Sequence, residues 1–337
     1  MKLECEGCKK VYNIPDDRLT LGKKISFPCP ACKTIIIIDL SPKDTQEIKQ
    51  DQSIEKLSGD ALKKKILKTM ENLAPMPQVV SRAREIMADP NSSFKDIGRV
   101  LETDQAITVR VLKMANSAYY GLSGTVSSIH QASVVLGFET LGQVITVAGT
   151  SKLLGKTLKG YRMKSGFLWK HSLAVAVGSK IIAHKRNPRI ENDAFSAGLI
   201  HDAGMLVLDH YIEERKDDFE EFLKDGTTTY LKAEKEIFGF DHADIAYELC
   251  KKWNIPEDQT LAIKLHHNPS VSDGSELAYI LYIADAMAKI GGYGVDIGDM
   301  RYQIDGQAKE FLSLQDDEIN AYISEMTESV EKIAREM

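Results

Sequence analysis

The sequence predicts a mainly α-helical protein that is preceded by a small β-structured segment. Three observations support this fold class. From about residue 58 onward, apolar residues recur at helical intervals, and strand-like alternation is sparse. The first 40 residues instead show short strand-like stretches and hold four of the five cysteines. Between the two parts, residues 41–57 are rich in Asp, Glu, Gln and Lys and offer almost nothing to bury, which predicts a flexible linker.

The N-terminal cysteines have the spacing of a four-cysteine zinc site. CEGC and CPAC together form C-x2-C-x20-C-x2-C, and each C-x2-C turn can place two thiolates at two corners of a tetrahedron. Because residues 1–40 have few apolar side chains, metal binding should supply their folding energy. The segment also resembles the small bacterial zinc ribbons found at the N-termini of regulatory proteins. We expect one structural zinc ion, bound by Cys5, Cys8, Cys29 and Cys32.

Composition limits the location and the partners. No uninterrupted apolar stretch approaches the ~20 residues that span a bilayer, and the start of the chain lacks the apolar core of a secretory signal. We therefore expect a cytoplasmic protein with no membrane partner. A net charge of −6 argues against broad electrostatic capture of nucleic acid. The lysines of residues 1–40 leave a local nucleic-acid contact open, with protein docking as the alternative.

Local signals predict where several helices begin. Ser93 and Asp96 form an S-x-x-D capping box, because each side chain can bond the other's backbone N–H. Asp241 is placed to cap the helix that follows it. Ser313 and Asp316 predict a further capping box ahead of the last helix.

The last helix carries a narrow apolar seam. Its members repeat at intervals of four and three residues: Ile319, Ile323, Met326, Val330 and Ile333. We expect the seam to pack back on the helical body, as amphipathic helices normally do. A homodimer formed through this helix is the alternative.

Three phrases of the helical part resemble a known family. LAPMPQ, LETDQAITVRVLKMANSAYYG and SSIHQASVVLGFETLGQVI look like hallmark phrases of the HDOD domain (HD-related output domain), a bacterial signalling module related to HD phosphohydrolases. The resemblance runs from about Leu73 to Ala288. It implies a multi-helix HD-like bundle over residues 58–337, divided into an N-terminal helical part, 58–160, and an HD-like part, 161–337.

Histidine and aspartate residues lie on apolar helical stripes in the second half. A single histidine of this kind is more often a core imidazole with local hydrogen bonds, but a buried carboxylate needs a cation or several hydrogen bonds. Several helices that each present imidazole or carboxylate inward can build a metal site. Such mixed ligands suit iron, manganese, zinc or nickel without choosing among them. The candidates are His171, His201, Asp202, His242, His266, His267 and Asp285.

The order H…HD…H…HH…D also resembles that of HD phosphohydrolases. The resemblance implies that one ion is held by His171, His201, Asp202 and Asp285. It implies that His242, His266 and His267 accommodate a second ion, as in HD-GYP cyclic-dinucleotide phosphodiesterases. If the chain is active, Asp202 is the residue we expect catalysis to need. Two departures weigh against hydrolysis: Met205 stands where HD-GYP enzymes have lysine, and HHNPSVSDGSEL lacks the GYP signature.

These observations favour a regulatory function. HDOD proteins are viewed as mostly non-catalytic, so the resemblance implies a signal-transduction protein that acts through contacts with a signalling protein partner. A metal-dependent phosphohydrolase is the alternative. A nucleic-acid-binding regulator that uses its zinc ribbon is the second alternative.

Overall fold

The chain divides into two compact units. This computed structural model describes residues 2–4, 8–13, 24–39, 58–73, 76–89, 91–101, 103–122, 124–224, 226, 228–294 and 304–336. The units comprise residues 1–56 and 57–337. The predicted linker, residues 41–57, and the predicted zinc ligand Cys5 lie outside the described residues.

The described part of the first unit consists of two antiparallel strand pairs. The strands are β1 (Lys2–Glu4), β2 (Val11–Asn13), β3 (Lys24–Pro28) and β4 (Ile35–Asp39). Leu3 lies opposite Tyr12 in the first pair, and Phe27 lies opposite Ile36 in the second. Between β3 and β4, the Cys29 N–H donates to the Thr34 carbonyl over 2.7 Å. This bond closes the turn that contains the CPAC motif.

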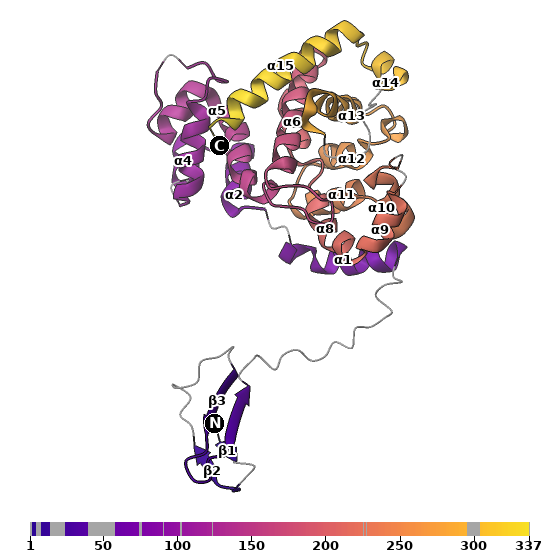
Figure 1. Cartoon of the computed structure of the whole chain (residues 1–337). Helices are drawn as coiled ribbons and strands as arrows, with labels where there is room; N and C mark the ends of the chain where they lie inside the picture. Colours follow the sequence, from indigo (N-terminus) through magenta and orange to yellow (C-terminus); the bar gives the residue numbers. More distant parts are fainter. Residues whose placement is uncertain are drawn as a thin grey trace. The chain divides into compact units, whose positions relative to one another are not determined.

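The second unit is helical, as predicted (Figure 1). Its first helices are α1 (Gly59–Leu73), α2 (Gln78–Ala88), α3 (Phe94–Leu101), α4 (Gln105–Ala115) and α5 (Ile129–Leu154). The next are α6 (Phe167–Arg186), η3 (Pro188–Ile190), α7 (Glu191–Ile200), α8 (Met205–Glu214), α9 (Lys216–Phe222) and α10 (Tyr230–Phe238). The last are α11 (His242–Lys252), α12 (Glu257–Leu265), η4 (Pro269–Val271), α13 (Glu276–Ala288), η5 (Lys289–Tyr293), α14 (Gly306–Phe311) and α15 (Asp316–Ala334). The mainly α fold class is therefore confirmed.

Helix α5 is the longest of the described helices. Gly137 interrupts it with φ 77°, a left-handed conformation that glycine adopts without a Cβ clash. By length and composition α5 is the one described helix that could cross a bilayer, but 56% of its apolar window is buried inside the unit. This burial is what a core helix of the bundle requires.

The predicted cap at Ser93 forms in part, and the predicted cap at Asp241 forms in full. The Ser93 N–H donates to Asp96 Oδ2 over 2.9 Å, but the Asp96 N–H donates to the Ser93 carbonyl rather than to the Ser93 hydroxyl. Asp241 and Asp244 form a reciprocal capping box at the start of α11, which fixes the first residue of that helix. The second cap has a functional consequence, because the first residue of α11 is His242.

The predicted cap of the last helix is wrong by two residues. Gln315 and Glu318, rather than Ser313 and Asp316, form the capping box of α15. The reason is the exit from α14, where Ser313 takes up a left-handed φ of 51° and donates its N–H to the Glu310 carbonyl. The chain has therefore not yet turned into α15 at Ser313.

Helix α15 packs back on the helical unit, as predicted (Figure 1). Ile319, Met326, Val330 and Ile333 of its seam are buried. Met326 lies over Gly178 of α6, where a Cβ would lie 3.3 Å from the Met326 Sδ, tighter than an ordinary van der Waals contact. The seam therefore serves the core of its own chain, and a homodimer stays a prediction.

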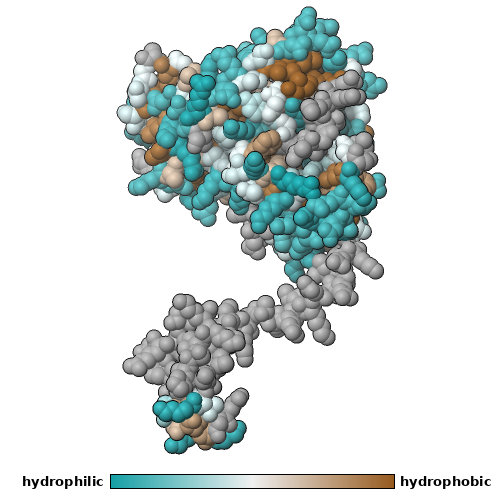
Figure 2. All heavy atoms as spheres, in the orientation of Figure 1, coloured by the Kyte–Doolittle hydropathy of each residue, from teal (hydrophilic) through white to brown (hydrophobic). Residues whose placement is uncertain are grey.

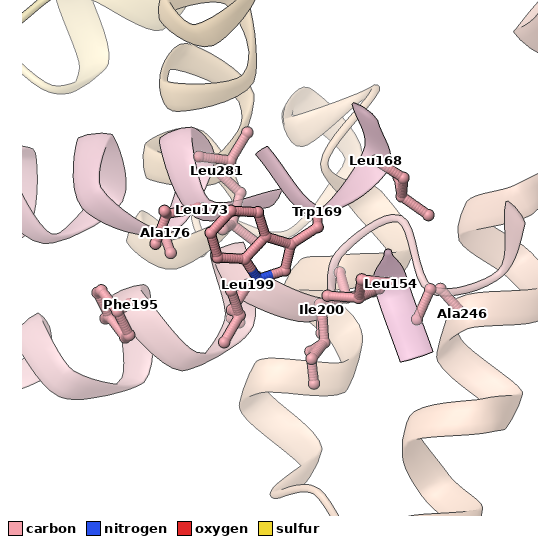
Figure 3. Close-up of a cluster of buried hydrophobic side chains, with 14 of the residues drawn as sticks. Leu154, Leu168, Trp169, Leu173, Ala176, Phe195, Leu199, Ile200, Ala246 and Leu281 are labelled. Carbon is pink, nitrogen blue, oxygen red and sulfur yellow. The ribbon is translucent and has the colours of Figure 1, made fainter. Parts of the chain in front are cut away.

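A buried cluster around Trp169 joins five helices (Figure 3). Its labelled members come from α5, α6, α7, α11 and α13: Leu154, Leu168, Trp169, Leu173, Ala176, Phe195, Leu199, Ile200, Ala246 and Leu281. All are buried, so they exclude water from the helix interfaces. Large exposed apolar side chains are scattered instead, on a surface that is mostly hydrophilic in the view of Figure 2. This core sets the positions of the helices that carry the candidate site.

Candidate metal centre

The seven predicted His and Asp residues come from five separate places in the helical unit. His171 lies on α6, and Asp285 lies on α13. The His–Asp pair follows the last residue of α7, His242 begins α11, and the paired histidines follow α12. All seven are buried except His267, which is half-buried.

Two glycines of the AGLIHDAG motif allow these helices to approach. A Cβ on Gly198 of α7 would lie 2.8 Å from the Ala176 Cα of α6. A Cβ on Gly204 would lie 1.9 Å from the His242 carbonyl oxygen. Since real Cβ atoms do not approach so closely, only glycine permits both contacts. The motif thus brings Asp202 near histidines of α6 and α11.

One carboxylate oxygen of Asp202 faces the first group of predicted ligands. Asp202 Oδ2 lies 3.3 Å from His171 Nε2 and 3.2 Å from His201 Nε2. The candidate ligand atoms of these three residues all lie within 4.8 Å of one another. Asp285 joins from the side, with its Oδ1 3.3 Å from His171 Nε2.

The other carboxylate oxygen of Asp202 faces the second group. Asp202 Oδ1 lies 3.3 Å from His242 Nε2 and 3.6 Å from His266 Nε2. His267 Nε2 lies 2.8 Å from His242 Nε2. These four residues again place their candidate ligand atoms within 4.8 Å of one another. Asp202 is therefore common to both groups, whereas the family resemblance had implied it for one ion only.

The outer nitrogens of three histidine rings are held by backbone carbonyls. Nδ1 of His171, His201 and His266 lies 2.8, 2.8 and 2.6 Å from the carbonyl oxygens of Tyr293, Gly198 and Ile263. Because a carbonyl oxygen only accepts, each Nδ1 must carry the proton. In the neutral rings, each Nε2 then turns a lone pair toward Asp202.

His242 is held by a buried carboxylate that the sequence analysis did not identify. Glu234 Oε2 accepts from the His242 backbone N–H over 2.8 Å and lies 2.7 Å from His242 Nδ1. Tyr161 Oη donates to Glu234 Oε1 over 2.7 Å. A signal was available, because Glu234 shares a helical stripe with the buried residues Tyr230 and Phe238.

Among the described residues, five inward-facing atoms of this centre have no hydrogen-bond partner. They are His171 Nε2, His201 Nε2, His266 Nε2, Asp202 Oδ1 and Asp285 Oδ1. Buried polar atoms are rarely left in this state, and each costs free energy. The donor set and its convergence therefore fit one or two metal ions.

The pKa shifts show how strongly these groups interact. Burial disfavours protonated His171, but Asp202 and Asp285 outweigh it and raise the pKa of His171 to about 9. Burial opposes ionisation of Asp202, but the surrounding histidines, His201 foremost, hold its pKa well below the usual range. Burial, with a contribution from His201, lowers the pKa of His266 to about 4. The histidines of the centre thus keep its carboxylates ionised although these carboxylates are buried.

A small cavity leads to the centre. Its volume is about 90 Å³, and Asp202, His242 and His267 belong to its lining. Met205, which stands where HD-GYP enzymes have lysine, belongs to the same lining. Lys289, which was not predicted as a site residue, also lines the cavity. Its position four residues after Asp285 is the signal that could have identified it.

Three predicted cysteine ligands lie together in the first unit. The Sγ atoms of Cys8, Cys29 and Cys32 lie within 4.8 Å of one another, and those of Cys8 and Cys29 are 3.7 Å apart. Cys5 lies outside the described residues, so the four-cysteine zinc site stays a prediction. Cys250 is fully buried on α11, as a packed core residue should be.

Comparisons with known proteins agree with this fold. An uncharacterised protein of Treponema pallidum (strain Nichols) is 24% identical over 207 residues, which cover 59% of this chain and 39% of that relative. An HDOD domain protein of unknown function from Geobacter sulfurreducens has a TM-score of 0.65 at 22% identity, covering 80% of this chain and 97% of its own. A candidate phosphohydrolase from Shewanella amazonensis SB2B has a TM-score of 0.62 at 20% identity, with the same coverage.

At these identities the structural likeness establishes the fold alone, and the match spans about two fifths of the Treponema protein. The family model of the HDOD domain, however, matches residues 73–269, more than half of the chain. This match covers the phrases between Leu73 and Ile145 as well as six of the seven His and Asp residues. It supports a signalling or HD-related role. The chain belongs to the HDOD domain family.

Proposed function

We propose that this chain is a signal-transduction protein whose HDOD domain binds two transition-metal ions. The observation that carries the proposal is the set of inward-facing atoms without hydrogen-bond partners, in which each of the three histidines is held from outside by a backbone carbonyl. A core histidine that served packing alone would not need its inner nitrogen turned toward a carboxylate. Four histidine rings turned toward Asp202 are better explained by metal ligation.

The two groups around Asp202 define which residues would hold each ion. His171, His201, Asp202 Oδ2 and Asp285 Oδ1 would bind one ion. His242, His266, His267 and Asp202 Oδ1 would bind the other. The imidazole and carboxylate donors suit iron, manganese, zinc or nickel. Such ions, when bound, supply Lewis acidity and can lower the pKa of a bound water.

A regulatory protein without catalysis remains the preferred form of the proposal. Family membership supports signalling, and Met205 leaves the cavity without the lysine that HD-GYP enzymes carry there. A metal-dependent phosphohydrolase is the second candidate. It is favoured by Lys289, which brings a cation into the same cavity from another helix.

Elemental analysis of the full chain tests metal binding. We expect the wild type to carry up to two more equivalents of metal than Asp202→Asn, because both groups share that carboxylate. Metal at the cysteines is common to both proteins and cancels in the difference. Asp209→Asn is the matched control, since Asp209 is a half-buried carboxylate that accepts hydrogen bonds outside the centre. Equal metal contents in folded wild type and Asp202→Asn would contradict the proposal.

Turnover distinguishes the two candidates. We expect the manganese- or iron-loaded chain to leave bis-(p-nitrophenyl) phosphate intact. Hydrolysis that is lost in Asp202→Asn would establish the second candidate instead.

The proposed partner is a signalling protein, and the proposed location is the cytoplasm. Contact with nucleic acid through the first unit is the competing proposal. It requires salt-sensitive DNA binding that disappears when residues 1–40 are removed.

A further inference from the structure

We propose that Lys289 makes the cavity beside the metal centre a binding site for a single phosphate group. The ligand would be free orthophosphate or the phosphate of a small phosphomonoester. This inference rests on the metal binding proposed above, and it names the ligand that the same centre would recognise.

The size of the cavity limits what can enter. Sites for drug-sized ligands typically occupy roughly 300–1,000 Å³. The cavity here has about 90 Å³, and Asp202, His242 and His267 form part of its lining. A group of a few heavy atoms fits this space next to the predicted ligands. A cyclic dinucleotide does not.

The lining of the cavity selects for a compact anion. Met163, Met205 and Leu231 belong to the lining, and their side chains offer no strong polar contacts to a sugar or base. The Tyr161 hydroxyl is already used, because it donates to Glu234. Among the described lining residues, Lys289 is the one lysine or arginine. A phosphate group could therefore be bound between this ammonium group and the metal ions.

Asp285 connects Lys289 to the metal centre. Lys289 Nζ donates to Asp285 Oδ2 over 2.7 Å, while Asp285 Oδ1 faces His171 and has no hydrogen-bond partner. The Asp285 carboxylate thus accepts from Lys289 with Oδ2 and faces the metal centre with Oδ1. If Oδ1 binds a metal ion, the negative charge that holds Lys289 is partly neutralised. Lys289 is then more available to an anion, so metal and phosphate should increase each other's affinity.

The same short segment also holds His171. Lys289 begins the π-helical turn η5, and Tyr293 at its end accepts from His171 Nδ1. Gly292 permits this turn, because its φ is 88°. The anion contact and the orientation of a predicted ligand therefore depend on one turn of backbone.

Isothermal titration of the full chain with orthophosphate tests the proposal. We expect the manganese-loaded wild type to bind one orthophosphate, and Lys289→Met to bind it about tenfold more weakly or worse, as the loss of a charge-assisted hydrogen bond requires. Lys289→Arg should retain most of the affinity. Lys332→Met is the matched control, because Lys332 forms an i,i+4 ion pair of equal length, 2.7 Å, with Glu328 on α15. Wild-type affinity in Lys289→Met would overturn the proposal.

Three further measurements separate the parts of the inference. Methyl phosphate in place of orthophosphate shows whether the ligand is the free ion or an ester. Cyclic dinucleotides should not compete, and competition at equal affinity would overturn the size argument. Orthophosphate binding of equal strength with and without manganese would overturn the coupling through Asp285. Metal analysis of the same samples shows which proposal fails: no metal refutes the proposed metal centre, whereas bound metal without phosphate binding refutes this inference alone.

Discussion

The two candidate metal clusters of this chain are built in opposite ways. In the first unit, Cys8, Cys29 and Cys32 lie near short strand pairs, and Cys29 is the one buried apolar residue among the side chains described there. In the helical unit, the histidines and Asp202 lie in a large core, and backbone carbonyls hold the rings from outside. The helical unit can therefore position its ligands without metal, whereas the first unit should depend on metal to fold.

Removal of metal should produce the largest difference between the two units. We expect a strong chelator to unfold residues 1–40, because zinc contributes roughly 10–16 kcal/mol to the folding of small zinc-binding peptides. The helical unit should keep its fold. Amide spectra of the full chain by NMR measure both units at once. Cys29→Ser should reproduce the effect, whereas Cys250→Ser, which alters a buried cysteine of α11, should leave residues 1–40 folded. Loss of the helical signals on chelation would contradict the comparison.

The pH should affect the metal-free helical unit next most strongly. The pKa of His171 is raised from its ordinary 6.5 to about 9 in the folded chain. Its stabilising contribution is therefore fully present below pH 6.5 and is lost as the pH rises through about 9. We expect the free energy of unfolding to fall by about 2–3 kcal/mol between pH 7 and pH 9.5.

Tryptophan fluorescence during urea unfolding measures this change. Trp169 and Trp253, the two tryptophans of the chain, both belong to the helical unit, so the signal excludes the first unit. His266 and His267 have lowered pKa values and remain neutral across this range, so they add no slope. Burial opposes protonation of His242, but Glu234 and Asp202 raise its pKa well above the usual value, so His242 adds a loss of stability in the same direction. Metal should displace the His171 proton, and the loaded chain should lose the pH dependence. A stability that rises above pH 7 in the metal-free chain would refute the argument.

Glu234 tests whether the outer hydrogen bonds of the helical unit contribute to its metal affinity. Outer hydrogen bonds to ligating histidines typically contribute 10–100-fold to metal affinity. We expect Glu234→Gln to weaken metal binding by about this factor, because the amide replaces the carboxylate that holds His242. Competition with a metal indicator dye measures the affinity. Glu236→Gln, on the exposed face of the same helix, should have no effect.

The sequence predicted the helical fold and the membership of the centre because both depend on regular spacing. His201 and Asp202 stand out as polar residues within an apolar helix, and Asp285 does so on α13. Neither the sharing of Asp202 between two groups nor the hydrogen bond from His171 Nδ1 to the Tyr293 carbonyl follows from periodicity, since each depends on how distant helices pack.

The residues that were missed carry weaker local signals. Glu234 resembles any charged helix residue until Phe238 and Tyr230 are seen to be buried on the same side. Lys289 follows Asp285 by four residues, a pair that usually indicates an exposed helix surface rather than a cavity. The cap at Gln315 was missed because a serine side chain gives no signal that the backbone of Ser313 takes up a left-handed φ.

The smallest predicted effect is a difference in thiol reactivity between the cysteines of the two units. Burial raises the pKa of the Cys250 thiol to about 12, so it has almost no reactive thiolate at pH 8.5. After chelation, iodoacetamide should label Cys8 and Cys32 while it leaves Cys250 unmodified, because the helical unit remains folded. Peptide mass spectrometry measures each site, and labelling in urea provides the positive control for Cys250. Labelling of Cys250 at the rate of Cys8 would show that chelation also opens the helical core, and the two clusters would then not differ in their dependence on metal.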